Sequence, residues 1–406
     1  MRPVEEARAE VLAAMPRLGA EQVGLEHALG RILAEDALAG HDVPPFPNSA
    51  MDGFAVISAD VAEVPVRLDV LEDVPAGSVA TQAVREGTAI KIMTGAPMPS
   101  GADAVVKVES THQPAPDLVE IRESVSAGTA VRPAGGDFPA GTRIVQSGSR
   151  LGPVEVSLLA TVGVSAPLVS RRPRVAVMST GDELVAPSTA DLAPGMIRDS
   201  NRPLMRGLVV EAGADVVDMG VVGDDEVALT SALSAASADA DAIVTSGGVS
   251  MGDYDLVKQV LAASGEVGFW QVAMQPAKPF AFGHVAGTPL FGLPGNPVSA
   301  LVAFEQFVRP ALLHMQGGRH LLRPQLKVRM GEAVDTDPQK LVFVRVVVTE
   351  EDGVSVARLS GGQSSNVLSA VTTADGFAVV PVGVGAVAEG DVVSLELFRH
   401  PERRAL

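Results

Sequence analysis

The spacing of apolar and polar positions changes along the 406-residue chain and divides it into regions of different expected structure. Apolar residues three or four apart predict an amphipathic helix over residues 3–16, and a second short helix is predicted for residues 25–33. Residues 45–139 carry short alternating or β-branched runs separated by Gly and Pro, which indicates a small β domain. The segment HQPAPD within it (112–117) has the composition of an exposed hairpin loop.

From residue 172 onward the runs are nearly all apolar, as is typical of strands buried on both faces of a sheet. Helical patterns separate them, so an open α/β sheet is expected over residues 172–318. The expected helices of this domain span 202–212, 226–238, 255–263 and 297–313. Further strand-like runs predict a C-terminal domain resembling a β-barrel over residues 319–406. Residues 1–44 and 140–171, with a helix expected over 153–161, are assigned to an elongated mixed helical and linker domain. The predicted fold class is therefore multidomain, α/β plus β.

Composition limits the classes of function. With 47% apolar and 20% charged residues, the chain is expected to fold as a soluble protein. Its formal net charge of −18 argues against binding nucleic acid, which requires a basic face. Cys is absent, which excludes disulfides and cysteine metal sites and suits a reducing compartment. The N-terminus lacks the apolar core of a signal peptide, and prolines interrupt the uncharged run between His284 and Glu305, so a cytoplasmic protein without a membrane span is expected.

The stretch ADAIVTSGGVSMGDYD (240–255) carries the strongest local sign of chemistry. An apolar run ends in hydroxyl side chains and the turn Gly247-Gly248, and Asp253 is placed to cap a following helix. The N–H groups of such a turn and of a helix start can bind a phosphate or an oxyanion. A tight turn that binds nothing explains the same pattern equally well. The stretch also fits G-x-S-x-G around Ser250, which makes a serine hydrolase a weaker alternative.

Three carboxylates, Glu183, Asp224 and Asp255, follow three different strands of the expected sheet. Parallel strands end at the same edge, so these side chains can meet in one cleft and hold a magnesium ion that bridges phosphate oxygens. Helix N-capping explains Asp224 and Asp255 just as well, and both interpretations stay open. In the small β domain, turn geometry alone accounts for the polar points at Thr94 and Asp137.

Several strings, taken together, resemble one family. They are NSAMDGFAV (48–56), KIMTGAPMPSGADAVV (91–106), MSTGDEL (178–184), IRDSNR (197–202), TSGGVSMGDYD (245–255), KPFAFG (278–283) and GLPGNPVSA (292–300). Over nearly the whole chain this pattern resembles the molybdopterin molybdenumtransferases of the MoeA type, and it is similar to the C-terminal domain of gephyrin. The resemblance implies a molybdopterin-binding α/β domain and the last step of molybdenum cofactor assembly. In that step, molybdate enters the dithiolene of adenylylated molybdopterin, with Mg²⁺-dependent release of AMP.

The resemblance also implies a homodimer in which each active site lies between the α/β domain of one subunit and the small β domain of the other. The implied catalytic residues are Asp52, Thr94, Asp137, Glu183, Asp224 and Asp255, of which Glu183 and Asp224 would bind magnesium. The implied binding residues for substrate or molybdate are Gly247, Gly248, Ser250, Lys278, Pro294, Gly295, Asn296, Pro297, Ser299, Arg345 and Ser365. An adenylyltransferase and a molybdoenzyme are the implied protein partners.

One departure affects the implied oxyanion pocket. Many family members have the sequence KPGKP where this chain has Gln275-Pro276-Ala277-Lys278-Pro279, so one positive charge is missing. Tungstate has the same charge and nearly the same shape as molybdate, and the choice between them stays open. The main alternative to an enzyme is a scaffold on the same fold that binds partners without catalysis. The carboxylates at positions 52, 183, 224 and 255 argue against it, because a scaffold does not need them.

Overall fold

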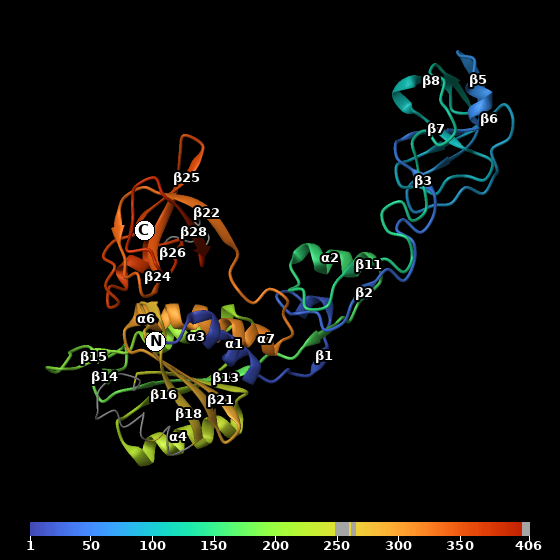
Figure 1. Ribbon diagram of the computed structural model, residues 1–406. Helices are drawn as coiled ribbons and strands as arrows, with labels where there is room; N and C mark the ends of the chain where they lie inside the picture. Colours follow the sequence, from blue (N-terminus) through green and yellow to red (C-terminus); the bar gives the residue numbers. More distant parts are fainter. Residues whose placement is uncertain (248–259, 261–264, 400–406) are drawn as a thin grey trace.

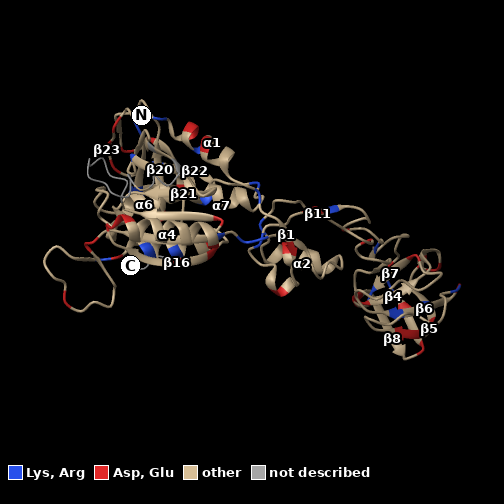
Figure 2. Ribbon diagram, turned by 90° about the horizontal axis from the view of Figure 1, so that it is seen from below, with Lys and Arg blue, Asp and Glu red and all other residues tan. Residues whose placement is uncertain are grey.

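The computed structural model describes residues 1–247, 260 and 265–399, and shows a molecule that is elongated in both views (Figures 1 and 2). A β domain lies at one end and is joined through a narrow middle region to an α/β layer and a C-terminal barrel at the other end. None of the helices in the described ranges is long and apolar enough to cross a membrane.

The distal β domain is a six-stranded sheet in the order β7-β4-β6-β5-β9-β8. Its strands are β4 (Gly53–Val56), β5 (Val66–Val74), β6 (Thr88–Ile92), β7 (Ala104–Lys107), β8 (Thr111–Ala115) and β9 (Leu118–Ile121). Successive residues of β4 alternate between two apolar clusters: Phe54 lies in one and Ala55 in the other, so both faces are covered. The segment predicted as an exposed loop is mostly strand β8, which pairs with β9 and leaves only Pro116 and Asp117 in the turn.

The middle region consists of short paired strands and one helix. Strand β1 (Ala20–Gln22) pairs with β12 (Leu168–Ser170), β2 (Ala37–Leu38) pairs with β11 (Arg143–Val145), and α2 spans Pro153–Thr161 as predicted. The helix predicted for residues 25–33 is wrong, because only a 3₁₀ turn forms at Leu25–His27. Gly30 has a φ of 78°, which no α-helix accommodates, and it ends the turn there.

Helix α1 (Val4–Ala14) packs on the α/β layer instead of the middle region to which residues 1–44 were assigned. Its buried residues Val4, Ala7 and Val11 belong to the same apolar cluster as the helices of that layer. An amphipathic pattern shows that a helix has an apolar face but does not identify the surface that covers it.

The α/β layer is a six-stranded sheet in the order β16-β13-β17-β21-β20-β18, and its first four strands are parallel. The strands are β13 (Arg174–Thr180), β16 (Asp215–Val222), β17 (Ala242–Ser246), β18 (Gly265–Gln271), β20 (Pro279–Val285) and β21 (Thr288–Leu293). Helix α3 (Asn201–Glu211) and the continuous segment of α6 (Pro297–Ala303), a π-helical turn (Phe304–Val308) and α7 (Arg309–Met315) cover one face. Helix α4 (Glu226–Asp239) covers the other face (Figure 1).

The C-terminal domain is a closed five-stranded barrel. Strands β24 (Leu341–Glu351), β25 (Val354–Leu359), β22 (Gln325–Met330), β28 (Val392–Leu397) and β26 (Gly376–Val380) follow one another, and β26 also pairs with β24. The short strand β19 (Met274–Gln275) joins β24 from the α/β side. The segment around Gln275 therefore belongs to the junction between the α/β layer and the barrel.

Candidate active site

The carboxyl ends of the parallel strands form one polar edge of the α/β sheet. Thr180 of β13 is in register with Val222 of β16, and Ser246 of β17 is in register with Leu293 of β21. The segments that follow these strands, at residues 181–183, 223–225, 247 and 294–296, therefore leave the sheet side by side. This edge is where open α/β sheets bind ligands.

The apolar side chains of these strands are replaced by hydroxyl side chains at the same edge. Ser179 and Ser246 lie toward α3, since Ser179 Oγ donates to Asp199 Oδ1 at 3.0 Å and Ser246 Oγ contacts Asn201 Nδ2 at 2.6 Å. Thr180, on the other face, donates to the Ser246 carbonyl at 3.3 Å. Gly247 has a φ of 98°, and a Cβ there would lie 2.6 Å from the Thr180 carbonyl oxygen, so only glycine fits this turn.

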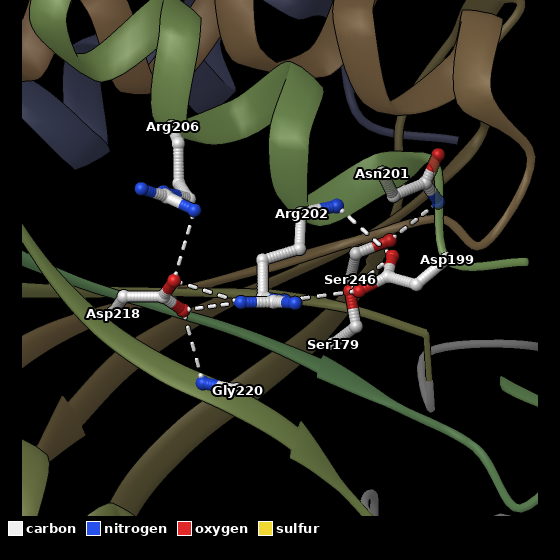
Figure 3. A network of polar contacts seen from close by, with 8 residues as sticks. All are labelled: Ser179, Asp199, Asn201, Arg202, Arg206, Asp218, Gly220 and Ser246. Carbon is white, nitrogen blue, oxygen red and sulfur yellow. Dashed lines mark hydrogen bonds and ion pairs between the residues drawn. The ribbon is translucent and has the colours of Figure 1, made fainter. Parts of the chain in front are cut away.

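A network of charged groups fixes the start of α3 against the sheet (Figure 3). Arg202 contacts Asp199 at 3.1 Å through Nε and Asp218 at 2.7 Å through Nη1, and Arg206 reaches Asp218 at 3.0 Å. Partial burial alone would raise the pKa of Asp218. Hydrogen bonds from Arg202 and from the N–H of Gly220, together with both arginine charges, outweigh it and hold that pKa below its ordinary value.

Glu183 and Asp224 follow the neighbouring strands β13 and β16, and both are exposed. The carboxylate of Asp182 accepts the N–H of Asp224 at 2.9 Å and joins the two loops. The capping interpretation of Asp224 is wrong, because Asp225 is the N-cap of α4 and accepts the Ala228 N–H at 2.8 Å. The Asp224 carboxylate makes no hydrogen bond or ion pair with the described residues, and neither does that of Glu183.

These two carboxylates suit one kind of metal ion. Among the described residues no group of three or more His, Cys, Asp or Glu side chains could hold a metal. Mg²⁺ does not require three protein side chains, because one or two carboxylates, water and substrate phosphates together supply its six ligands. Two exposed carboxylates on neighbouring loops at the end of the sheet, with no partner among the described residues, fit that donor set.

The turn before α6 connects the polar edge to the barrel. Asn296 Nδ2 donates to Ser365 Oγ at 3.0 Å, and the N–H of Val298 donates to the Ser365 carbonyl at 3.2 Å. Pro294 and Ser299 are buried, whereas Gly295 and Asn296 are exposed and Pro297 is half-buried. Sequence positions almost 70 residues apart thus meet here.

Arg345 lies beneath the same junction. Its side chain is fully buried, and its Nη2 donates to the carbonyls of Gly362 at 2.7 Å and Ser364 at 3.2 Å. Nε and Nη1 are buried without a hydrogen-bond partner in the described ranges, and burial lowers the pKa of this guanidinium. Arg345 therefore shapes the loop that presents Ser365, and it is a buried cation. Gln275 is exposed in β19, which pairs with β24, and Lys278, three residues further on, is also exposed.

Three further predicted catalytic residues belong to segments in or beside the distal β domain, which lies far from this edge in the single chain (Figure 1). Asp52 and Thr94 line a hollow of about 560 Å³ together with Lys107 and Glu109. Two hydrogen bonds from Thr94 hold the pKa of Asp52 below its ordinary value. Asp137 is exposed in the loop that runs toward the middle region, where its N–H donates to the Val43 carbonyl at 2.9 Å.

Three predicted residues, Gly248, Ser250 and Asp255, lie outside the described residues, as does the proposed cap Asp253. Three further contributors to the edge are not among the predicted site residues: Ser179, Asp199 and Asn201. All three fall within the strings quoted for the family resemblance. The sequence pattern that could have identified them is the change from apolar to polar residues at the end of β13 and around the start of α3.

The fold and this edge define a class of protein: a multidomain α/β protein whose parallel sheet ends in a polar edge beside a β-barrel. Three family models match consecutive parts of the chain: the MoeA N-terminal region (domain I and II) at residues 2–163, a probable molybdopterin binding domain at residues 176–314 and the MoeA C-terminal region (domain IV) at residues 327–398.

Full-length relatives agree with these matches. Molybdopterin molybdenumtransferase 2 of Mycobacterium tuberculosis is 39% identical over 400 residues, covering 96% of this chain and 98% of that protein. The molybdopterin molybdenumtransferase of Haemophilus influenzae is 35% identical and covers 98% of this chain and 99% of its own. Two structures of molybdopterin biosynthesis MoeA protein from Pyrococcus horikoshii superpose with TM-scores of 0.86 and 0.80, at 27% and 35% identity, and each covers 98% of this chain with 100% and 99% of its own. The chain belongs to the molybdopterin molybdenumtransferase family, as the sequence resemblance predicted.

Proposed function

We propose that this protein is a transferase that inserts molybdenum into molybdopterin, using molybdate and adenylylated molybdopterin and releasing AMP. The observation that carries the proposal is the polar edge itself. It brings exposed carboxylates, a glycine turn and the Asn296–Ser365 contact together in a chain that matches the named transferases over almost its full length. Cleaving a pyrophosphate bond requires groups that stabilise developing negative charge, and the exposed backbone of Gly295 and Asn296, beside the Ser365 hydroxyl, is available at this edge for that purpose.

Glu183 and Asp224 are the proposed ligands of a magnesium ion. When bound, Mg²⁺ would neutralise charge on the phosphate oxygens of the substrate. The chain's own contribution is to hold the two carboxylates on neighbouring loops, which Asp182 joins through the N–H of Asp224. The Gly247 turn and residues 294–296 orient the phosphates, and Lys278 supplies positive charge for the oxyanion.

A homodimer is the proposed functional unit. Asp52 and Thr94 belong to the distal β domain and Asp137 to the loop that joins it to the middle region, so one subunit cannot bring them to the Glu183 edge without a large rearrangement (Figure 1). A second copy can supply them, as the family resemblance implies. Asp52 has a lowered pKa and is therefore ionised at neutral pH, ready to position a cationic or hydroxyl group.

The proposal is tested by measuring AMP release from adenylylated molybdopterin with Mg²⁺, with and without molybdate, while transfer of cofactor to an apo-molybdoenzyme is followed. We expect molybdate-dependent release that Glu183→Ala and Asp224→Ala abolish. Release with tungstate alone would identify a tungsten enzyme. A folded dimer that releases no AMP with either oxyanion would point to the non-catalytic scaffold.

The dimeric site has a separate test. Asp52→Ala and Glu183→Ala subunits are each expected to be inactive as homodimers. When they are unfolded and refolded together, mixed dimers contain one intact site, and about a quarter of the wild-type activity should return. No recovery from well-folded mixed dimers would contradict a site shared between subunits.

A further inference from the structure

Asn201, the first residue of α3, contacts two of the segments at the polar edge. Its Nδ2 lies 2.6 Å from Ser246 Oγ, a contact drawn in Figure 3, and 2.6 Å from the Gly295 carbonyl oxygen. A carbonyl oxygen can only accept, so the amide nitrogen must face Gly295. Both amide hydrogens are thereby used, and one side chain ties the end of β17 to the turn before α6.

The side chain is firmly held. Only 8% of Asn201 and 2% of Ser246 is exposed. Asp199 accepts the N–H of Arg202 at 3.1 Å and the hydroxyl of Ser179 at 3.0 Å, so the first turn of α3 is fixed to β13. Ser200, at the N-cap position, makes no capping bond with its side chain, and Asp199 takes over that role. The start of α3 is thus anchored independently of Asn201.

The contacts continue from Asn201 into the barrel. Gly295, which accepts from Asn201, is followed by Asn296, whose amide donates to Ser365. Gly247, which follows Ser246, donates its N–H to the Leu293 carbonyl at 3.1 Å. A displacement of about 1 Å between groups that must act together can cost 10²-fold in rate.

We propose that Asn201 is a positioning residue of the transfer reaction, an inference that rests on the proposed function. It sets the spacing between the Ser246–Gly247 turn and the 294–296 turn, so that groups from two strands and from the barrel meet the substrate together. The role requires an amide: aspartate has the same shape but would place an acceptor against the Gly295 carbonyl oxygen, and serine or alanine is too short to span both contacts.

The experiment compares Asn201→Asp, Ser246→Ala and the double variant with two controls in the same region. Ser200→Ala alters the neighbouring exposed residue, and Arg206→Ala removes an ion pair from the same network through a side chain that is 49% exposed. We expect Asn201→Asp to lower kcat for molybdate-dependent AMP release about 10- to 100-fold. Its Tm should fall by no more than about 4 °C. The two losses should combine to less than their product in the double variant, because both variants perturb the Asn201–Ser246 contact. Both controls should keep wild-type kcat.

A second measurement is independent of catalysis. Hydrogen exchange at the N–H of Gly247, bonded to Leu293, and at that of Val298, bonded to Ser365, should accelerate in Asn201→Asp and stay unchanged in Arg206→Ala. Unchanged exchange in Asn201→Asp, or a wild-type kcat, would overturn the inference. If exchange accelerates but the wild-type protein releases no AMP, Asn201 does hold the two turns together and the proposed function is wrong.

Discussion

Asp52 accepts two hydrogen bonds from Thr94, one from the backbone N–H and one from Oγ1, both at 2.7 Å. The two residues are 42 positions apart, and the loops that carry them meet at the edge of the distal sheet. Both bonds favour the ionised carboxylate, and the pKa of Asp52 is lowered as a result. Asp52 remains exposed, so lone pairs are left for a ligand or for a second subunit.

Thr94→Ala removes one of these two bonds and keeps the backbone one. Because the lost bond favours the charged form, the pKa of Asp52 should rise toward its ordinary value. The acidic limb of the activity profile should move to higher pH in the same direction. A carboxylate-resolved NMR titration measures the pKa directly. Thr94→Ser retains the hydroxyl and should behave like the wild type; an identical shift in both variants would show that the hydroxyl is not responsible.

Asp218→Asn tests the charged network beneath α3. The folded-state pKa of Asp218 is lowered, so its stabilising contribution is complete above its unfolded-state pKa and is lost as pH falls through the folded-state pKa. At pH 7 the free energy of unfolding of Asp218→Asn should be about 1 kcal/mol lower than that of the wild type, since the Asp218 side chain faces two arginines but is partly solvated. Unfolding by denaturant from pH 7 down to pH 3 should show this difference shrinking. Asp239→Asn, which removes one exposed ion pair with Arg174, is the matched control and should cost less.

Much of the α/β layer could be predicted because its signals are local. The buried strands and helices α3 and α4 appear in the sequence as apolar runs and periodic stripes, and the structure has them within a few residues. The wrong helix at residues 25–33 failed at Gly30, whose positive φ depends on how the chain turns back toward Leu151. Strand β8 was missed because Pro114 and Pro116 are typical of loops, whereas the pairing with β9 fixes the segment.

In the candidate site too, local features could be predicted from the sequence and contacts between distant segments could not. Residues after strand ends, such as Glu183 and Asp224, could be placed at one edge because parallel strands share their direction. The Asn296–Ser365 contact could not, since it depends on how the barrel docks on the α/β layer. The proposed partner of the distal Asp52 hollow is a second chain, which one sequence does not place. Sequence spacing contains neither relationship: the family resemblance implied the shared dimer site and the two residues Asn296 and Ser365, but not the contact between them.

Glu305→Gln tests the buried junction between α6–α7 and the segment that leads into the barrel. Glu305 is 4% exposed and accepts from Arg323 at 3.0 Å and 2.9 Å. Removing the charge of Glu305 deprives the partly buried guanidinium of Arg323 of its close ion-pair partner, which should cost about 3 kcal/mol. Thermal unfolding at pH 7 should show the loss. Glu211→Gln is the control, because that side chain is 48% exposed and lies 4.0 Å from the same arginine. Equal losses in the two variants would contradict the role of burial.

Gln275→Lys tests whether the oxyanion pocket of this chain lacks a positive charge. Gln275 is exposed in β19, three residues before Lys278, and β19 lies against β24 of the barrel. A second ammonium group within several ångströms of a dianion in a solvated pocket should add about 1 kcal/mol of attraction, which corresponds to a roughly 5-fold lower KM for molybdate. The gain should shrink with added salt, because exposed charges are screened.

The ratio of KM values for molybdate and tungstate should stay unchanged in Gln275→Lys, because an added charge does not discriminate between two dianions of the same shape. Gln113→Lys is the matched control: it adds the same charge to exposed strand β8 of the distal domain and should leave KM unchanged. If both variants lower KM equally, attraction by the whole acidic protein is the cause. If neither does, Gln275 does not face the oxyanion, and the pocket must be sought on the Ser365 side of the junction.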